Sequence, residues 1–447
     1  MAPVRRQSKV MRLALPVMLG MLSQSMLNLV DAALVGHLGE EALAGVGLGG
    51  YAMFMMTALV FGLSSSVQSQ TAHAFGEGRT APTALQAGLL ISLGVGVPLT
   101  AWAWWQAPWW IQLIAPADDV SQVAVDYFRW RVLSLAVIAM TLCLRGYWNG
   151  LQHTHLYLRI VVAVHLVNVL LSAGLIYGLA GLPALGTNGA AMGTSLSLLL
   201  GLLAWAWVTL RARITWQPLP LAVLWQTVRL AFPHSLQQLW FAAGYVVLFW
   251  LLGRLGTSSV AVGHVLVNLS LLLILPGVGI GVAAMSLVGE ALGRDDQLEA
   301  HRWGLDALRV AAMMLSILAL PMLLFPAQIL GIFFTDPALL ELGTLPLRIT
   351  AVMIVLDAAA LVLAQALMGA GAQRTVMLLT LGMQWLVFLP LAWWVGIVMG
   401  YGLVGVWLSQ LCYRLLNSGS FLWVWQRRRW LAHGLKAMPE RKRINSI

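Results

Sequence analysis

The sequence predicts an all-α integral membrane protein with twelve transmembrane helices in two pseudo-symmetric six-helix lobes. Three observations lead to this fold class: an apolar composition, an uneven distribution of basic residues and an internal repeat. Hydrophobic residues make up 60% of the 447 positions, and charged residues make up only 9%. A soluble protein carries about a quarter charged residues, so the composition excludes a soluble fold.

Apolar runs of about 20 residues, long enough to cross about 30 Å of hydrocarbon, fill most of the chain. The first run follows a basic segment, but it is too long for a signal peptide and lacks a small-residue cleavage pattern, so we expect it to be retained as a helix. Both cysteines, Cys143 and Cys412, lie inside apolar runs, which indicates neither a disulfide framework nor a metal cluster. The predicted helices are 11–36, 48–74, 82–106, 121–144, 157–180, 187–210, 228–253, 262–290, 303–325, 343–367, 376–398 and 402–425.

Basic residues gather on one side of these predicted spans. If both termini lie on that side, 20 of the 26 Lys and Arg residues fall there, in the N-terminal segment, the short loops and the tail. The positive-inside rule then predicts that both termini are cytoplasmic and that the number of spans is even. The net charge of +10 is therefore a signal of topology, and we expect no nucleic-acid partner.

The chain repeats itself after about half its length. "LALP" at 13–16 matches "LAFP" at 230–233, and the same offset in numbering relates Gly62 to Gly279. Further on, "NGLQHT" at 149–154 matches "AGAQRT" at 370–375, and "GTNG" at 186–189 matches "GLVG" at 402–405. Two six-helix copies that enter the membrane from one side form a parallel repeat, and transporters place substrate between such halves. The predicted parts are an N-terminal lobe (1–210), a cytoplasmic linker (211–227), a C-terminal lobe (228–425) and a basic cytoplasmic tail (426–447).

Polar residues interrupt the apolar helices of the first half. The acid in the first helix, Asp31, is either a carboxylate paired with Arg129 or Arg131, or a protonatable switch. The matching position in the second half is Leu248, so the fold does not require an acid there. Polar groups inside a membrane usually face the bundle interior, although each alone is more often a contact between helices than a ligand. The candidates for one polar pocket with Asp31 are Gln24, Asn28, Asn168, Ser172 and Thr194.

The second half contains another acid within a predicted span, Asp357, close to the middle of the helix at 343–367. Arg414 lies at a similar depth in the last helix. The two residues either form a structural ion pair or Asp357 contributes to a cation site. Among the histidines, His165 and His264 stand alone, and no metalloprotease, serine-hydrolase or ATP-binding motif is present. We therefore expect no enzyme activity, no bound metal and no cofactor.

The run "NLVDAALVGHLGEEALAGVGL" followed by "FGLSSSVQSQTAHAFGEGR" resembles the multidrug and toxic compound extrusion (MATE) transporters. "RGYWNGLQHT" and "LVGEALGRDD" fit the same pattern, and the resemblance covers residues 11 to about 425. It implies two six-helix lobes in a V, a monomer in the cytoplasmic (inner) membrane of a bacterium, and export of amphipathic, often cationic, drug-like compounds. The driving ion in this family is H⁺ or Na⁺.

The resemblance also implies roles for individual residues. Asp31 matches a coupling acid on the first helix, and Thr194 matches a threonine on the sixth. Asn168 matches a family asparagine on the fifth helix, whereas Ser172 stands where the family has an acid. Pro16 matches a proline that lets the first helix bend when the coupling acid changes protonation.

In the NorM-like branch of the family, the position of Asp357 contributes to a cation site in the second lobe. Phe241 occupies the position of the glutamate partner in that site. The two missing carboxylates favour proton coupling through Asp31, as in DinF-like members. We therefore expect an H⁺-coupled exporter, and the alternatives are Na⁺ coupling, flipping of a lipid-linked sugar as in the same superfamily, and a membrane enzyme.

Overall fold

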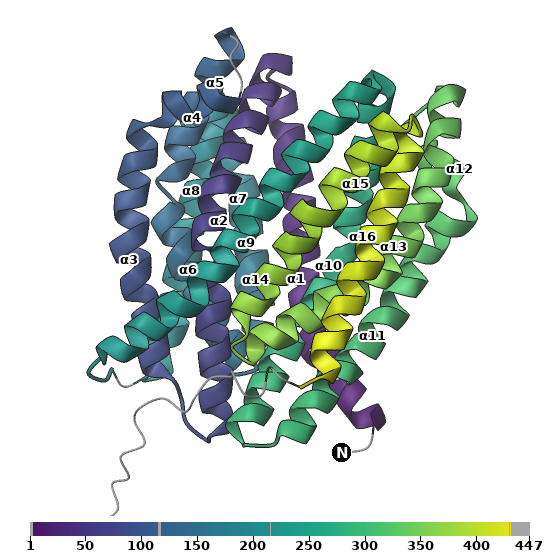
Figure 1. The fold of residues 1–447 in the computed structure, drawn as a ribbon. Coiled ribbons are helices and arrows are strands. Elements are labelled where there is room, and N and C mark those ends of the chain that lie inside the picture. The colour runs from purple at the N-terminus through teal and green to yellow at the C-terminus, as the bar shows by residue number, and fades with distance from the viewer. Residues whose placement is uncertain (1–2, 115–117, 215, 429, 431–447) are drawn as a thin grey trace, which may run out of the picture. The chain divides into compact units, whose positions relative to one another are not determined.

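The computed structural model describes residues 3–114, 118–214, 216–428 and 430, and all regular structure among them is helical (Figure 1). Contacts divide the chain into two compact units. The first-half unit contains Leu19–Ser235, and the second-half unit contains the described residues up to Met18 and from Leu236 onward. Two helices, α1 (Pro3–Gly36) and α9 (Leu221–Leu255), begin in one unit and end in the other.

Among its described residues, the first-half unit contains seven complete helices, with α2 packed against α5 and α6, and α7 packed against α8. A short 3₁₀ turn at Leu179–Gly181 joins α7 to α8. The helices are α2 (Glu40–Gly76), α3 (Pro82–Trp105), α4 (Ala107–Ile114), α5 (Asp118–Val132), α6 (Leu135–Gly150), α7 (Thr154–Tyr177) and α8 (Gly186–Arg211).

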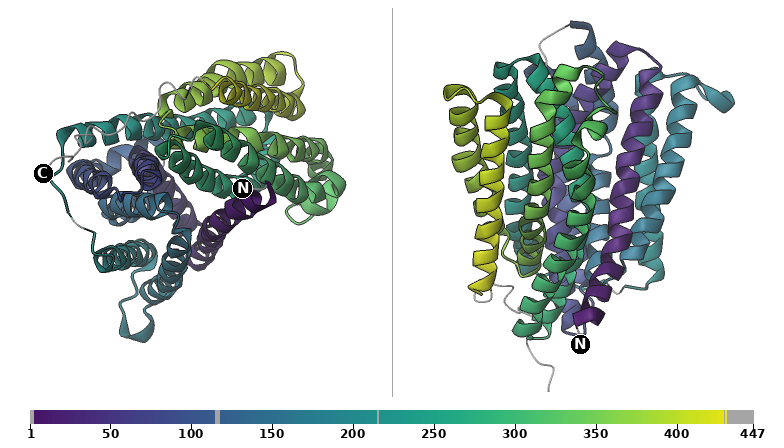
Figure 2. Two further views of the ribbon diagram at one scale, coloured as in Figure 1. Left: turned by 90° about the horizontal axis from the view of Figure 1, so that it is seen from below. Right: turned by 90° about the vertical axis from the view of Figure 1, so that its right-hand side faces the viewer.

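The second-half unit has its core where α13 contacts α10, α11 and α16. Figure 2 shows these long helices standing side by side. Wide π-helical turns at Met383–Phe388 and Trp394–Val398 interrupt the segment before α16. The helices are α10 (Thr257–Gly293), α11 (Gln297–Leu324), α12 (Pro326–Leu330), α13 (Pro337–Gly369), α14 (Gln373–Gly382), α15 (Leu389–Trp393) and α16 (Gly402–Gln426).

The described helices account for the twelve predicted spans. In the part of the chain that the structure describes, ten continuous helical segments are long and apolar enough to cross a membrane, and α5 with α6 make an eleventh with a bend of 47°. The last helix, α16, has 25 residues but is less apolar because it carries polar side chains such as Gln410 and Asn417. These side chains are buried within the unit, so they avoid lipid. α16 is thus the twelfth span.

Several element boundaries differ from the sequence prediction. α9 begins at Leu221, directly after Pro220, so part of the segment predicted as a linker is helical. α2 begins at Glu40 rather than at 48, because two glutamates in its first turn suit the positive end of a helix. The fourth span breaks at Ser134, whose hydroxyl donates to the Arg131 carbonyl at 2.7 Å. Most of the predicted tail lies outside the described residues.

The structure corrects one part of the predicted repeat. Gly150 lies against the Gln68 carbonyl, and Gly369 lies against the carbonyl of Met285, which is the counterpart of Gln68 at the offset that relates Gly62 to Gly279. Gly150 therefore corresponds to Gly369, whereas the motif match "NGLQHT" with "AGAQRT" paired it with Gly371. The left-handed residues of the two turns, Gln152 and Gly371, are shifted by the same amount as Gly150 and Gly369. The motif match was wrong because it aligned the glycine that follows asparagine in one turn with the glycine that follows alanine in the other.

In each repeat, the start of the first helix belongs to the unit formed by the other repeat. The boundary between the units falls at equivalent positions of the two helices. The unit boundary falls after Met18 in α1 and after Ser235 in α9, which are counterparts in the repeat. Met18 packs on Gly279 of α10, and Ser235 packs on Gly62 of α2, whose amide donates to the Ser235 hydroxyl at 3.0 Å. Because the two glycines are also counterparts in the repeat, the two contacts are equivalent.

Polar contacts anchor both of these helix starts. At the start of α1, Arg6 forms an ion pair with Asp306 at 3.1 Å, and Lys9 forms one with Glu290 at 3.3 Å. At the start of α9, the buried His234 bonds to the hydroxyl of Ser65 at 2.6 Å. The Thr227 hydroxyl accepts from the Gln70 amide at 3.0 Å. The first residues of α1 and α9 are therefore integral parts of the units that receive them.

Candidate functional site

In the first-half unit, the C-terminal part of α1 lies along α7. Gly20 touches the ring of Tyr157, Gln24 bonds to His165, and the Tyr177 hydroxyl donates to the Leu34 carbonyl at 2.5 Å. Since these contacts advance together along both helices, α1 and α7 run parallel. This pairing places the polar face of α1 next to α7.

Asp31 lies half-buried on this part of α1. Its Oδ1 atom is buried and makes no hydrogen bond within the described part of the chain. The positive charge that acts on Asp31 is that of Arg131 on α5, but no ion pair joins these two described residues. Arg129, the other candidate partner, lies over the ring of Trp104 with its guanidinium carbon 5.2 Å from the ring centre. Asp31 is thus a carboxylate that faces a cation without contact.

Two of the predicted pocket residues, Gln24 and Asn28, are exposed and bonded to each other on the same helix. The side-chain Nε2 of Gln24 donates to Asn28 Oδ1 at 3.2 Å, and the side-chain Oε1 of Gln24 lies 3.0 Å from His165 Nε2. The other ring nitrogen of His165 lies 2.7 Å from the Ser23 hydroxyl. The sequence offers His165 no metal-binding partner, and its amide and hydroxyl partners are evident only from the position of α7 beside α1.

Two of the other predicted pocket residues, Asn168 and Ser172, are bonded to each other on α7, and the third, Thr194, lies on α8. The Ser172 hydroxyl donates to Asn168 Oδ1, and the Asn168 amide donates to the Ser197 hydroxyl, both at 3.2 Å. The Thr194 hydroxyl donates to the Ala190 carbonyl of its own helix. Asn168 and Ser172 are buried. Within the described ranges no hydrogen bond or ion pair links Asn168, Ser172 or Thr194 to Asp31.

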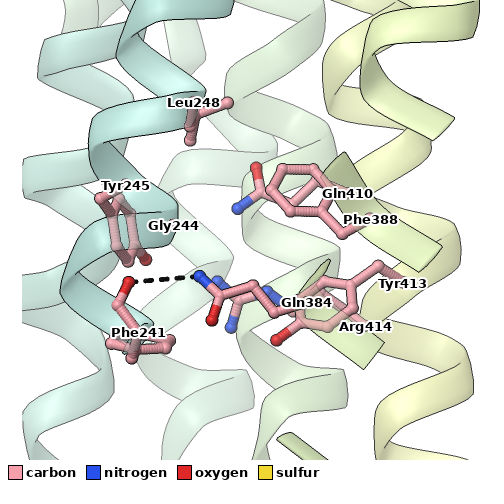
Figure 3. A pocket seen from close by; sticks show the side chains of 9 residues that line it. All are labelled: Phe241, Gly244, Tyr245, Leu248, Gln384, Phe388, Gln410, Tyr413 and Arg414. Atoms are coloured by element: carbon pink, nitrogen blue, oxygen red, sulfur yellow. Dashed lines mark hydrogen bonds between the residues drawn. The ribbon is translucent and has the colours of Figure 1, made fainter. Parts of the chain in front are cut away.

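In the second-half unit, aromatic and amide side chains from α9, α16 and the π-helical turn line a small cavity (Figure 3). The cavity encloses about 10 Å³, enough for roughly one water molecule. The Gln384 amide nitrogen donates to the Phe241 carbonyl at 3.2 Å, while the Gln384 carbonyl oxygen is buried without a partner among the described residues. The lining residues are Phe241, Gly244, Tyr245, Leu248, Gln384, Phe388, Gln410, Tyr413 and Arg414.

Arg414 also forms an ion pair with the buried Asp357 of α13. The guanidinium of Arg414 lies 5.7 Å from the ring centre of the adjacent Tyr413. Of the two interpretations of Asp357, the ion pair is the one that has a contact in the structure. Phe241, which stands where a NorM-like site has a glutamate, packs its ring on Tyr245 at 5.2 Å.

The repeat relates this cavity to the polar face of α1. The two halves can be aligned at three places. Gly62 with Gly279 gives the offset in numbering for α1 and α9, and Gly150 with Gly369 gives it for the turn before α14. The left-handed glycines that open α8 and α16 give the offset for those two helices. With this alignment, five cavity residues have first-half counterparts on the polar face of α1 or next to it. Four of these five counterparts are candidate site residues predicted from the sequence. The pairs, second half first, are Phe241 with Gln24, Tyr245 with Asn28, Leu248 with Asp31, Gln384 with His165, and Gln410 with Thr194.

Pro16 lies inside α1, in the part that belongs to the second-half unit. Its counterpart in the repeat is Pro233, which lies inside α9. Both prolines remove a hydrogen bond from their helix just before the point where the helix passes between units. The bending role that the resemblance implies for Pro16 stays a prediction.

Comparisons with known proteins identify the family of the chain. A family model described as MatE matches residues 16–173 and 233–394. A protein named probable multidrug resistance protein NorM from Bradyrhizobium diazoefficiens is 30% identical over 415 residues, covering 90% of this chain and 89% of its own. Multidrug resistance protein PmpM from Pseudomonas aeruginosa is 26% identical, covering 92% of this chain and 91% of its own.

Solved structures share the fold at lower identity. An outward-facing multidrug resistance MATE family transporter of the MOP superfamily gives a TM-score of 0.86 at 24% identity, with 96% of this chain and 97% of that chain covered. A MOP superfamily transporter from Pyrococcus furiosus gives 0.85 at 24% identity, with 94% and 96% covered. These likenesses establish the twelve-helix, two-lobe fold.

Proposed function

The chain belongs to the MatE family, and from that premise we propose that it exports drug-like organic compounds in exchange for H⁺. It is a multi-pass membrane transporter of the multidrug efflux type and not an enzyme. The proposal adds the coupling ion, the residue that binds it and the class of substrate, which is amphipathic and often cationic. No cofactor takes part in the cycle.

The contrast between two membrane carboxylates supports the choice of ion. Asp357 is in contact with the guanidinium of Arg414, so its charge is already neutralised by the protein. Asp31 faces Arg131 without an ion pair, and its buried Oδ1 has no hydrogen bond within the described residues. A carboxylate that lacks a bound counter-ion is free to exchange a proton or to attract a cationic substrate. Asp31 is therefore the residue we assign to proton coupling.

Coupling requires only that proton and substrate use Asp31 in alternation. A proton that enters from outside neutralises the carboxylate, which weakens the hold on a cationic substrate and releases it outward. Release of the proton to the cytoplasm restores the charge and permits the next substrate to bind. A ligand shifts a conformational equilibrium only through its different affinity for the two states, and the charge of Asp31 supplies that difference.

Other predicted residues have supporting roles in this proposal. Gln24 and Asn28 form the exposed polar surface beside Asp31, and Asn168, which accepts from Ser172, bonds α7 to α8 through Ser197. Thr194 lies on α8 as a further polar group of the proposed pocket. The two repeats, 1–210 and 228–425, act as the two halves of the transport cycle, with bending of α1 near Pro16. We further propose a monomer in a bacterial inner membrane with both termini in the cytoplasm.

The test is dye efflux from proteoliposomes under an imposed pH gradient with sodium excluded. The wild-type protein should transport, and Asp31→Asn should lower the gradient-driven rate by at least tenfold while the protein still elutes as a folded species. Asp126→Asn serves as the matched control, because Asp126 is a carboxylate of the same unit whose partner is Gln122. Efflux by Asp31→Asn at the wild-type rate contradicts the assignment.

The experiment also separates the rival functions. Transport that begins only after sodium is added assigns coupling to a Na⁺ site, and Asp357 becomes the residue to test. Transport of a lipid-linked sugar without any dye efflux points to a flippase. The cavity of the second-half unit, with one ion-paired arginine and room for about one water, argues against a site for a sugar pyrophosphate.

A further inference from the structure

His165 is a buried titratable residue that the proposed cycle does not yet use. It lies on α7, 7% exposed, at the level where the polar face of α1 begins. Both ring nitrogens have partners on α1: Nδ1 lies 2.7 Å from the Ser23 hydroxyl, and Nε2 lies 3.0 Å from Gln24 Oε1. Gln24 connects in turn to Asn28, so an unbroken set of hydrogen bonds runs from the ring to an exposed polar surface.

The partners of His165 determine which nitrogen carries the proton in the neutral ring. Because the Gln24 amide nitrogen donates to Asn28, its carbonyl oxygen is the group that faces the ring, so Nε2–H donates to it. Nδ1 then accepts from the Ser23 hydroxyl. A second proton taken up at Nδ1 only reverses this last bond, since a hydroxyl accepts as readily as it donates. The site thus holds neutral or charged histidine with both nitrogens satisfied.

Among the charged groups around His165, Asp31 is the one that can carry a compensating negative charge. Along α1, α6, α7 and α8, all within the described ranges, Asp31 is the only carboxylate. Gln24 and Asp31 are two helical turns apart, about 10 Å along the helix axis. The other titratable or charged groups on these helices are His155, Tyr157, Arg159 and Tyr177 of α7, Cys143, Arg145 and Tyr147 of α6, Arg211 at the end of α8, and Arg5, Arg6, Lys9 and Arg12 at the start of α1.

The second half shows that the packing does not require a histidine. Gln384 occupies the equivalent position, and its amide donates to the carbonyl of Phe241, the equivalent of Gln24. Leu248 likewise stands in place of Asp31. Both titratable groups are therefore present together in the first half and absent together from the second. The repeat also supplies the least disruptive test substitution, histidine to glutamine.

We propose that His165 is a second proton-binding residue of the antiport cycle, which takes up its proton at Nδ1 and lies on the cytoplasmic side of Asp31. This inference rests on the proposed H⁺ antiport and extends it to two protons per substrate. Protons reach the ring from water at the exposed Gln24–Asn28 surface. Exchange of two protons for one monovalent cation moves one net positive charge inward in each cycle, whereas exchange of one proton moves none.

The first experiment uses ethidium, a monovalent organic cation, in proteoliposomes with sodium excluded. For two protons, a gradient of one pH unit should support an ethidium gradient of about a hundredfold, and a tenfold potassium gradient with valinomycin should change it about tenfold further. In His165→Gln, the pH unit should support about tenfold, and the potassium gradient should have no effect. His264→Gln is the control, because His264 is an exposed histidine of α10 outside both sites.

The outcomes distinguish this inference from the function on which it rests. No pH-driven transport by the wild-type protein contradicts the antiport itself. A wild-type protein driven by pH but insensitive to membrane potential, or His165→Gln with the wild-type sensitivity, overturns the role of His165 and leaves the antiport standing.

A binding measurement covers the case in which His165→Gln does not transport. Ethidium is added to the purified protein in weakly buffered detergent solution at about pH 6.5, near the ordinary pKa of histidine. The wild-type protein should release protons when ethidium binds, and His165→Gln and Asp31→Asn should each release fewer protons per ethidium than the wild-type protein. Equal release by the wild-type protein and His165→Gln contradicts the proposal.

Discussion

At the scale of single residues, one neighbour decides what a membrane carboxylate does. Asp357 and Asp31 both lie in apolar helices, but Arg414 contacts the first and no described cation contacts the second. The equivalents of Asp357 and Arg414 in the first half are Ile138 and Leu198, by the alignment of Gly369 with Gly150 and of Gly402 with Gly186. The fold therefore accepts an apolar pair where the second half has an ion pair.

The ion pair gives a stability prediction. Asp357→Ile alone leaves the Arg414 charge buried without a partner, which should destabilise the protein by about 3–5 kcal/mol. The double variant Asp357→Ile/Arg414→Leu reproduces the first-half pair and should recover most of the loss, because it removes both desolvated charges. Thermal unfolding of both variants in detergent measures this. A double variant less stable than the single one indicates that the pair is not what holds α13 to α16.

At the scale of elements, close approach of helices sets where the chain accepts no side chain. Gly62 lies where a Cβ would overlap the Ala231 carbonyl, and at Gly279 a Cβ would lie 2.5 Å from Met18 Cγ. The first obstacle is backbone and the second is a flexible side chain. Equivalent contacts in the two repeats therefore differ in how much substitution they tolerate.

Gly62→Ala should destabilise the protein by about 1–3 kcal/mol, because the start of α9 has to move away from α2. Gly50→Ala, on the same helix, is the control: a Cβ there meets nothing within 4 Å, and alanine favours a helix over glycine by about 0.5–1 kcal/mol. Gly279→Ala should have an intermediate effect. Size-exclusion profiles and melting temperatures of the three variants provide the measurement, and equal melting temperatures for the Gly62 and Gly50 variants contradict the explanation.

The sequence predicted the number and order of the spans because apolar length is a local property. It missed the break at Ser134 and the early start of α9, since both depend on contacts of individual side chains and prolines with the backbone. For the site, the spacing of Gln24, Asn28 and Asp31 was sufficient to place them on one face of α1. The partners of His165 were beyond reach, because they depend on how α7 lies against α1.

At the scale of the whole chain, the two repeats share positions but not chemistry. The face of α1 carries Gln24, Asn28 and Asp31, and the same face of α9 carries Phe241, Tyr245 and Leu248. One copy of the repeat thus keeps exchangeable polar groups, and the other replaces them with aromatic and aliphatic side chains around a small cavity. Duplication permits this division because each copy retains the backbone contacts that define the bundle.

The orientation of the chain in the membrane is the last prediction. The excess of Lys and Arg places the turn between α2 and α3 in the cytoplasm and the turn between α1 and α2 outside, since α2 spans the membrane between them. After Cys143→Ala and Cys412→Ser, a single cysteine is introduced by Thr80→Cys or His37→Cys, both at exposed positions.

A membrane-impermeant maleimide applied to intact cells should label His37→Cys fully and Thr80→Cys at less than about a tenth of that level. Permeabilisation should make the two labelling levels equal. Because α1, α2 and α3 are consecutive spans, this result fixes the N-terminus on the same side as Thr80, and an even number of spans then brings the end of α16 to that side. Labelling of Thr80→Cys in intact cells would invert the whole assignment, including the direction in which Asp31 and His165 receive their protons.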